Sequence, residues 1–203
     1  ISMKKRQSLT TRQQNALITK QSLYDAAIAL FLEKGYENVK IEEITQAANV
    51  AKGTFYIYFD SKKNLLYHSF DQFDSMYLDI YEKVCHIASF EEQLVAFLEL
   101  SYQSLNNMGK ELARALYHNS VLEDNPRQFN NERPLFQIIL KIVRVGLQTG
   151  ELNKEHSELY YLDLIKTQIA GIDFSWIVSA DDIDFSTFTK ANIYALTKGI
   201  LNI

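Results

Sequence analysis

The chain has 203 residues, of which 47% are hydrophobic and 23% are charged, a composition typical of a soluble globular protein with one or two domains. Its seven glycines and two prolines leave too few turn-forming residues for a β-sandwich or a β-barrel, so we expect an all-α fold. The one cysteine, Cys85, excludes an intramolecular disulfide bond. No segment has the roughly 18 consecutive apolar residues of a membrane span, and the N-terminal residues lack the apolar run of a secretory signal. We therefore expect a cytoplasmic protein that does not bind a membrane.

The charge is distributed unevenly along the chain. Residues 1–63 contain ten basic and six acidic side chains, whereas residues 64–203 contain 11 basic and 19 acidic ones. A basic N-terminal part followed by an acidic remainder indicates that a small part of the chain contacts a polyanion. The alternative is an uneven scatter of solvated surface charge.

Three short-range patterns predict helices in the N-terminal part. Apolar residues at helical spacing predict a first helix that ends before Gly35, a residue suited to a left-handed helix end. A second helix is expected over 41–48 and is followed by Asn49, which tolerates a left-handed turn. A third helix of two turns is expected over 52–59. Two short helices joined by a tight turn are typical of a helix-turn-helix motif.

Longer apolar periodicities follow and predict a helical bundle, which brings the total to about nine helices. The stretch 123–133 is polar, contains Pro126 and precedes Pro134, a residue suited to the first position of a helix, so we expect a loop there. The expected bundle helices are 61–85, 90–107, 110–122, 134–149, 155–179 and 184–202.

The predicted third helix has an unusual outward face. Phe55 and Phe59 define its core side, which leaves Gly53, Thr54 and Ile57 pointing to solvent. An apolar side chain can contact a thymine methyl group, a hydroxyl can bond a base or a phosphate, and glycine permits close approach of the backbone. An ordinary exposed isoleucine is the alternative interpretation.

Lys62 and Lys63 occupy the first turn of the next predicted helix, where the helix dipole disfavours cations by about 0.3–1 kcal/mol each. A phosphate at this helix start would be bound by free N–H groups and lysine together, with Asp60 or Ser61 capping the helix when DNA is absent. A solvated lysine pair is the alternative.

The run from Lys52 to Phe59, Lys-Gly-Thr-Phe-Tyr-Ile-Tyr-Phe, followed by Ser61 and two lysines, resembles the DNA-binding domain of TetR-family transcriptional regulators. The resemblance covers about 45 residues, and a weaker one lies near Gly146 and Gly150. It implies a dimeric repressor that binds a palindromic operator and is released by a small hydrophobic ligand. The expected organisation is a basic extension (1–19), a helix-turn-helix domain (20–65) and a helical ligand-binding and dimerisation domain (66–203).

Three positions differ from the family pattern. Lys40 replaces a threonine that caps the second helix, Asn49 replaces a turn glycine, and Ala51 replaces a serine that caps the third helix. We therefore expect poorly capped helices, at a cost of about 1 kcal/mol per lost cap.

A helical-bundle enzyme and a helical interaction protein without DNA binding are the alternatives. A di-metal bundle enzyme needs Glu-x-x-His pairs, and none is present. The sequence also lacks dinucleotide, phosphate-loop and Gly-x-Ser-x-Gly motifs. We expect no catalytic residues, no metal ligands and no cofactor, and the basic N-terminal part disfavours a pure interaction protein.

The residues expected to contact DNA fall into two groups. Those at the outward side of the third helix are assigned to bases in the major groove, and those flanking it are assigned to phosphates. The first group is Lys52, Thr54 and Ile57, and the second is Lys40, Tyr56, Tyr58 and Lys62. Gly53 is expected to let the backbone of the third helix approach the DNA closely.

The expected helix 155–179 is apolar on two opposed faces, so it must be covered twice. Small residues four apart in the last helix permit close helix packing. We predict a twofold dimer through a four-helix bundle, and burial inside one subunit is the alternative. The dimerisation residues are Leu164, Gly171, Phe174, Val178, Phe188, Ala191, Ala195 and Gly199.

The resemblance locates the effector pocket between the long helix that leaves the DNA-binding domain and the helices behind it. Aromatic side chains there favour a flat or hydrophobic ligand, although core packing would explain any one of them. Asp173 is expected to pair either with Lys166 or with a cationic group of the ligand. The candidates are Phe73, Tyr77, Phe97, Ser101, Tyr102, Tyr117, Phe136, Asp173 and Trp176.

Overall fold

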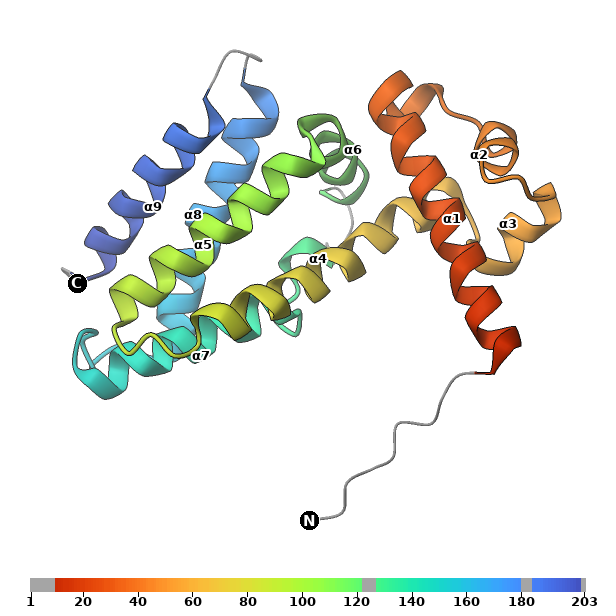
Figure 1. The fold of residues 1–203 in the computed structure, drawn as a ribbon. Coiled ribbons are helices and arrows are strands. Elements are labelled where there is room, and N and C mark those ends of the chain that lie inside the picture. The colour runs from red at the N-terminus through yellow and green to blue at the C-terminus, as the bar shows by residue number, and fades with distance from the viewer. Residues whose placement is uncertain (1–9, 122–126, 180–183, 202–203) are drawn as a thin grey trace. The chain divides into compact units, whose positions relative to one another are not determined.

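The computed structural model describes residues 10–121, 127–179 and 184–201, which form α-helices and two short 3₁₀ turns with no strand in those ranges (Figure 1). The expected all-α fold is confirmed. The helices are α1 (Thr11–Lys34), α2 (Ile41–Ala47), α3 (Lys52–Tyr58), α4 (Lys62–Val84), α5 (Phe90–Met108), α6 (Lys110–Ser120), α7 (Pro134–Thr149), α8 (Glu158–Val178) and α9 (Phe185–Leu201), and the turns are η1 (Tyr36–Asn38) and η2 (Arg127–Phe129).

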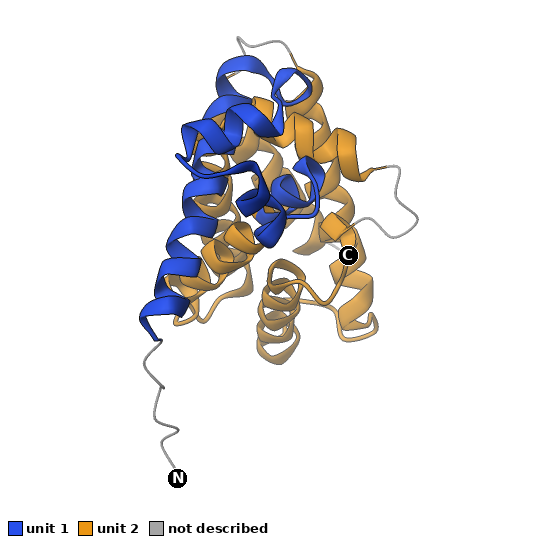
Figure 2. Cartoon of the chain, turned by 90° about the vertical axis from the view of Figure 1, so that its right-hand side faces the viewer, with its two compact units in different colours: residues 1–68 blue, residues 69–203 orange. Residues whose placement is uncertain are grey.

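The chain divides into two units, residues 1–68 and residues 69–203 (Figure 2). The boundary falls inside α4, so one continuous helix belongs to both units. Residues 11–19, which the sequence places in an extension, form the first turns of α1, where Thr10 and Gln13 make a capping box. Within the described ranges no helix is long and apolar enough to cross a membrane.

The first unit is organised around α1, which packs against α2, while α2 packs against α3. Phe31, Ile44 and Phe55 are almost completely buried between these helices. Asn49 has a φ of 53°, so the left-handed turn expected between the two short helices is confirmed. The tight turn fixes α3 relative to α2 and leaves one side of α3 outside the core.

The second unit is a bundle in which α5 packs against α9 and α7, and α8 packs against α6, α7 and α9 (Figure 1). Its centre contains fully buried aromatic side chains from α5, α7 and α8. Gly146 allows the close approach of α7, since a Cβ at this position would lie 2.7 Å from the Leu152 side chain and 2.9 Å from the Phe90 ring. The bundle therefore depends on close packing at this crossing.

Helix ends in the second unit are fixed by local hydrogen bonds. The Glu151 carboxylate accepts bonds from the Phe90 N–H (2.9 Å) and the Glu91 N–H (3.2 Å) at the start of α5. The helix expected from residue 155 begins instead at Glu158, because the Ser157 hydroxyl caps it by accepting the Tyr160 N–H at 3.2 Å. Of the expected loop 123–133, residues 123–126 lie outside the described residues, and the remainder contains η2.

Candidate DNA-binding surface and ligand pocket

One side of α3 is exposed, as the helical spacing predicted. Ile57 is 75% exposed and Tyr56 is 50% exposed, while no atom lies within 4 Å of a Cβ built on Gly53. Thr54 is half-buried, and Phe55 faces the core. An isoleucine exposed to this degree beside an unobstructed glycine gives α3 a surface on which another molecule can approach the backbone closely.

The basic and phenolic side chains around α3 differ in how freely they can contact another molecule. The Lys52 ammonium bonds a carboxylate oxygen of Glu42 on α2 at 2.5 Å, and both side chains are exposed. This exposed ion pair is weak, so Lys52 can exchange Glu42 for another partner at little cost. Lys40 is exposed at the start of α2, and Tyr58 is half-buried at the end of α3.

Lys40 makes no side-chain capping bond at the start of α2, as expected, but Glu43 stabilises this helix end in another way. The Glu43 carboxylate accepts the Lys40 N–H at 2.9 Å and also pairs with the Lys34 ammonium at 2.8 Å. These two bonds hold the pKa of Glu43 below its ordinary value. Glu43 thus supplies the reciprocal half of a capping box, while the bond that a threonine side chain would make is absent. At the start of α3, by contrast, Ala51 makes no capping bond, as expected.

Lys62 is placed differently from the sequence expectation. Its ammonium donates to the carbonyl oxygens of Tyr36 (2.6 Å) and Val39 (3.0 Å), and it lies 4.3 Å from the centre of the Tyr36 ring. Partial burial lowers its pKa. Lys62 therefore ties the first turn of α4 to the segment that joins α1 and α2, which leaves it less available to a phosphate. Ser61 caps α4 by accepting the Asn64 N–H at 3.0 Å.

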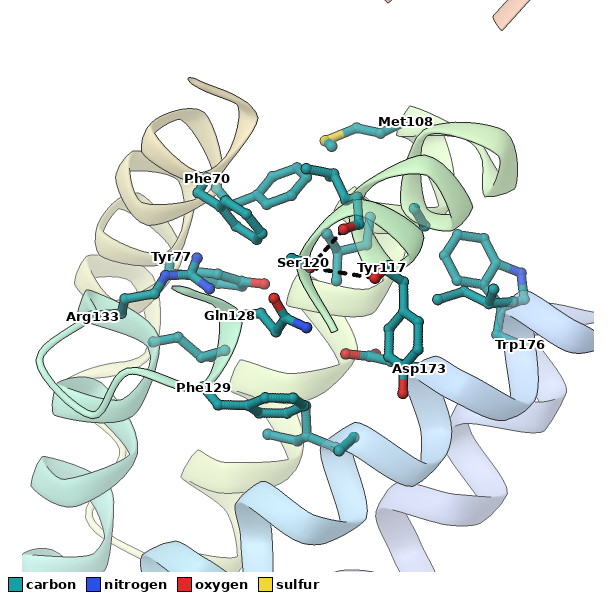
Figure 3. Close-up of a pocket in the computed structure, with 18 of the residues that line it drawn as sticks. Phe70, Tyr77, Met108, Tyr117, Ser120, Gln128, Phe129, Arg133, Asp173 and Trp176 are labelled. Carbon is teal, nitrogen blue, oxygen red and sulfur yellow. Dashed lines mark hydrogen bonds between the residues drawn. The ribbon is translucent and has the colours of Figure 1, made fainter. Parts of the chain in front are cut away.

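A cavity of about 110 Å³ lies within the second unit, among α4, the end of α5, α6, η2, α7 and α8 (Figure 3). Its walls are mainly aromatic and aliphatic, and its polar side chains are few. The lining residues include Phe70, Phe73, Tyr77, Met108, Tyr117, Ser120, Gln128, Phe129, Arg133, Phe136, Lys166, Ile169, Asp173 and Trp176.

Most of the predicted pocket residues line this cavity, and three do not. Phe97 is fully buried in the core, the Ser101 hydroxyl donates to the Phe97 carbonyl at 2.6 Å, and Tyr102 packs against the Phe185 ring. These three residues lie on turns of α5 that pack in the core, whereas Leu105 and Met108, nearer the end of the same helix, line the cavity. The residues that do line it are Phe73, Tyr77, Tyr117, Phe136, Asp173 and Trp176.

The sequence did not reveal the contribution of the segment between α6 and α7. Gln128, Phe129 and Arg133 all line the cavity. Arg133 makes two bonds to the Asp74 carboxylate on α4, at 2.7 and 3.0 Å, and both side chains are largely buried. This segment has no helical periodicity from which the direction of its side chains could be predicted. The one sequence feature that points to a buried role is an aromatic residue among polar ones before Pro134.

Asp173 has an unusual electrostatic environment. Burial raises its pKa to about 7, and hydrogen bonding from Tyr102 offsets part of that effect. The expected pair with Lys166 is not formed, because the Lys166 ammonium bonds the Asn131 side-chain oxygen at 2.6 Å. Within the described residues no cation neutralises the Asp173 carboxylate.

The apolar surface of α8 is divided as its periodicity predicted. Ile165, Ile172 and Trp176 are buried, whereas Phe174 is 48% exposed and Val178 is 61% exposed. The neighbouring side of α9 is also open, and it includes Tyr194, which the sequence analysis did not select. We call this surface the α8–α9 face: Leu164 and Phe188, which are half-buried, with Gly171, Phe174, Val178, Ala191, Tyr194, Ala195 and Gly199, which are exposed.

Comparison with known proteins agrees with this architecture. Residues 23–68 match the family described as "Bacterial regulatory proteins, tetR family". Transposon Tn10 TetC protein of Escherichia coli is 51% identical over 55 residues, which cover 27% of this chain and 28% of TetC. The fatty acid metabolism regulator protein of Bacillus subtilis is 23% identical over 89% of this chain and 94% of its own length.

The fold of the whole chain also has relatives among solved structures. The transcriptional regulator FadR of Bacillus subtilis, solved in complex with stearoyl-CoA, superposes with a TM-score of 0.74 at 23% identity, over 89% of this chain and 98% of that one. The helix-turn-helix unit followed by a helical bundle is thus a fold that this chain shares with that solved structure. Residues 23–68 are thus similar to the N-terminal part of tetR-family bacterial regulatory proteins, and the whole chain shares its fold with the solved regulator.

The placement of Lys62 leads to a first prediction. Lys62→Ala removes the bonds to the Tyr36 and Val39 carbonyls, so we expect the DNA-binding unit to lose on the order of 1–2 kcal/mol of stability. DNA affinity should fall without a change in its salt dependence. Lys40→Ala, which removes an exposed charge, is expected to reduce the salt slope by about one. Anisotropy titrations over a range of salt concentrations measure the DNA affinity and its salt slope, and thermal denaturation measures the stability. A reduced salt slope for Lys62→Ala would contradict this prediction and show that Lys62 contacts a phosphate.

The Asp173 carboxyl leads to a second prediction. Because its pKa is raised from 3.8 to about 7, the folded chain keeps a proton that the unfolded chain releases, so stability falls as pH rises from about 4 to about 7. Asp173→Asn should therefore stabilise the ligand-free protein by roughly 2 kcal/mol more at about pH 8 than at about pH 5. Thermal denaturation at both pH values tests this, with the exposed Asp79→Asn as control; equal gains at both pH values would contradict it.

Proposed function

We propose that this protein is a homodimeric repressor that binds a palindromic operator through α3 and is released when a small apolar molecule enters the cavity of its second unit. The exposed side of α3, with Ile57 and Gly53 at its centre, is the observation that carries the proposal. Stability alone does not favour an exposed isoleucine and a glycine in a two-turn helix, whereas contact with the major groove requires such a surface. A regulator of this kind acts in the cytoplasm.

The DNA contacts follow from the exposure of each candidate. Lys52, Thr54 and Ile57 contact base edges, and Gly53 allows α3 to lie close to the DNA. Lys40, Tyr56 and Tyr58 contact phosphates on either side of the groove. Lys62 acts mainly by holding the α1–α2 segment against α4, since its ammonium is engaged by carbonyl oxygens.

The α8–α9 face forms the dimer interface. It contains large apolar side chains beside small residues, and added Cβ atoms on Gly171 and Gly199 would meet nothing within 4 Å. An apolar surface of this extent is expected to be covered, and small residues let two helix pairs approach closely. A second copy of the chain, related by a twofold axis, covers it and places two α3 helices on successive half-sites.

The relatives support a ligand-responsive regulator rather than an enzyme. The Bacillus subtilis relative is a regulator of fatty acid metabolism, and its solved structure contains stearoyl-CoA. By analogy, the cavity of this chain binds an effector with a hydrophobic body, and the enclosing aromatic side chains suit such a ligand. We assign the chain no catalytic role.

The operator can be obtained by selecting bound duplexes from random DNA. We expect a palindrome with two half-sites about one helical turn apart, and its occurrence near the coding region of this protein would identify regulated genes. Ile57→Ala should relax preference at one base pair of each half-site, at a cost of about 1–3 kcal/mol there, while leaving the salt slope unchanged. Selection from random DNA with the unaltered protein and with Ile57→Ala measures the base preference, and anisotropy titration measures the affinity and its salt slope. Enrichment of no sequence by the unaltered protein would overturn the proposal.

Disruption of the α8–α9 face tests the dimer. Ala195→Arg places a charge on an exposed residue of α9, so the protomer should still fold, but the dimer should dissociate at micromolar concentration. Sedimentation velocity measures the state, and Gln72→Arg on the exposed side of α4 serves as the matched control. A monomeric unaltered protein, or a dimer that survives Ala195→Arg, would contradict this interface.

A further inference from the structure

We infer that the effector of this protein is an amphiphilic amine, whose protonated nitrogen binds Asp173 and whose apolar body lies against the aromatic walls of the cavity. The inference rests on the proposed ligand-binding role of the second unit, and it names the chemical class of the ligand. Asp173, the charges around it and the unpaired amide of Gln128 are the features that support it (Figure 3).

Asp173 supplies a negative charge that the protein does not neutralise. Its carboxyl group is enclosed by the cavity and has Tyr102 as its hydrogen-bonding partner. A buried carboxylate without a cation is costly, and a cationic ligand would remove that cost on binding. The same feature disfavours a ligand that carries an anionic group at this depth.

The nearby cations are already engaged. Arg133 is held by Asp74 through two hydrogen bonds, and Lys166 is held by Asn131 while lying 5.0 Å from the centre of the Phe136 ring. Neither is available to Asp173 in this arrangement. Because Arg133 is paired with Asp74, it contributes little net charge to the cavity. Asp173 is the acidic lining residue, and its charge has no partner of opposite sign within the described residues.

The walls provide the remaining requirements for cation binding. Aromatic rings attract cations through the negative potential of their faces, by about 0.5–2 kcal/mol each according to how far water is excluded. Rings are contributed from four directions, by Tyr77 on α4, Tyr117 on α6, Phe129 in η2 and Trp176 on α8. A carboxylate enclosed by aromatic rings suits an ammonium group better than it suits a neutral or anionic head group.

Gln128 provides a second, independent indication of a polar ligand group. Both its amide nitrogen and its amide oxygen are inaccessible to solvent, and neither has a hydrogen-bond partner within the described residues. Figure 3 shows the Gln128 amide and the Asp173 carboxyl directed into the same space. Since buried amides are almost always hydrogen-bonded, this one is poised to accept a bond from a ligand N–H group.

The size of the site limits the ligand. The cavity of about 110 Å³ is smaller than the roughly 150 Å³ that accommodates benzene, so it holds a head group rather than a long acyl chain. A shallow depression of about 320 Å³ next to it shares Phe129, Lys166 and Ala170. The ammonium group and the adjoining part of the apolar body therefore lie within the cavity, and a longer body extends over Phe129 and Ala170.

Amine binding should be coupled to the ionisation of Asp173. The titratable or charged groups around Asp173 are Tyr102, which bonds its carboxyl group, and Tyr77, Tyr117, Lys166 and Arg133, which line the cavity. Arg133 is paired with Asp74, and no histidine lines the cavity. Burial raises the pKa of Tyr77 further above the neutral range, so Asp173 is the group that changes charge near neutral pH. Affinity for the amine should increase about tenfold between about pH 6 and about pH 8.

The test uses Trp176, which is the only tryptophan in the chain and lines the cavity, so its fluorescence reports occupancy without DNA. Three probes of matched length are titrated against the full-length protein: phenylhexylamine, phenylhexanol and phenylhexanoate. We expect the amine to bind at least tenfold more tightly than the alcohol at about pH 8, and the carboxylate to bind most weakly.

Variants separate the charge from the shape of the site. Asp173→Asn should remove both the preference for the amine and its pH dependence while retaining alcohol binding, and Asp79→Asn should behave like the unaltered protein. Gln128→Leu should weaken amine binding several-fold, and thermal denaturation verifies that each variant is folded. Equal affinity for amine and carboxylate, an amine preference that persists in Asp173→Asn, quenching by stearoyl-CoA but not by the amine, or no response to any probe would overturn the inference.

Binding to the selected operator is measured in parallel without ligand. Operator binding by a protein that ignores the amine would refute the ligand class and leave the proposed DNA-binding function intact. Amine binding by a protein that binds no DNA would refute the proposed repressor and leave the site assignment standing.

Discussion

Helix α8 carries more apolar surface than one protomer can bury, and the second unit is arranged around this constraint. Its inner side, with Ile165, Ile172 and Trp176, completes the core of the bundle, while its outer side leaves Phe174 and Val178 exposed. Burial of the inner side is favourable by about 25 cal/mol per Å² of apolar area and fixes the rotation of the helix. Once the rotation is fixed, the direction of every other residue on α8 follows.

This rotation places the cavity and the α8–α9 face on opposite sides of the same helix. Asp173 lines the cavity, and its neighbour Phe174 lies on the exposed face. The Tyr117 ring, which also lines the cavity, lies 5.8 Å from the Phe174 ring. The Tyr117 and Phe174 rings thus form a direct contact between the cavity wall and the surface on which the second protomer is proposed to pack.

The polar groups of the second unit are of two kinds. Pairs such as Arg133 with Asp74 have their hydrogen bonds completed within the protein and hold the segment before α7 against α4. Asp173 accepts a hydrogen bond from Tyr102 but has no cationic partner, and the Gln128 amide has no hydrogen-bond partner within the described residues. Both residues line one cavity, and incomplete polar groups at a cavity are typical of a binding site rather than of a structural core. Away from the cavity, the Gln93 Oε1 atom of α5 is also buried without a partner in the part of the chain that the structure describes.

The sequence by itself determined the helices, the helix-turn-helix, the exposed side of α3 and the two apolar sides of α8, because each depends on residues within a few turns of one another. The left-handed turn at Asn49 and the exposure of Ile57 are of this kind. Tertiary structure decided the rest. The ammonium of Lys62 reaches carbonyl oxygens more than 20 residues earlier in the chain, Tyr102 packs behind the cavity wall, and Gln128 reaches the cavity from a segment without periodicity. Such contacts depend on how separate helices pack, and local spacing carries no information about which distant atoms a side chain will meet.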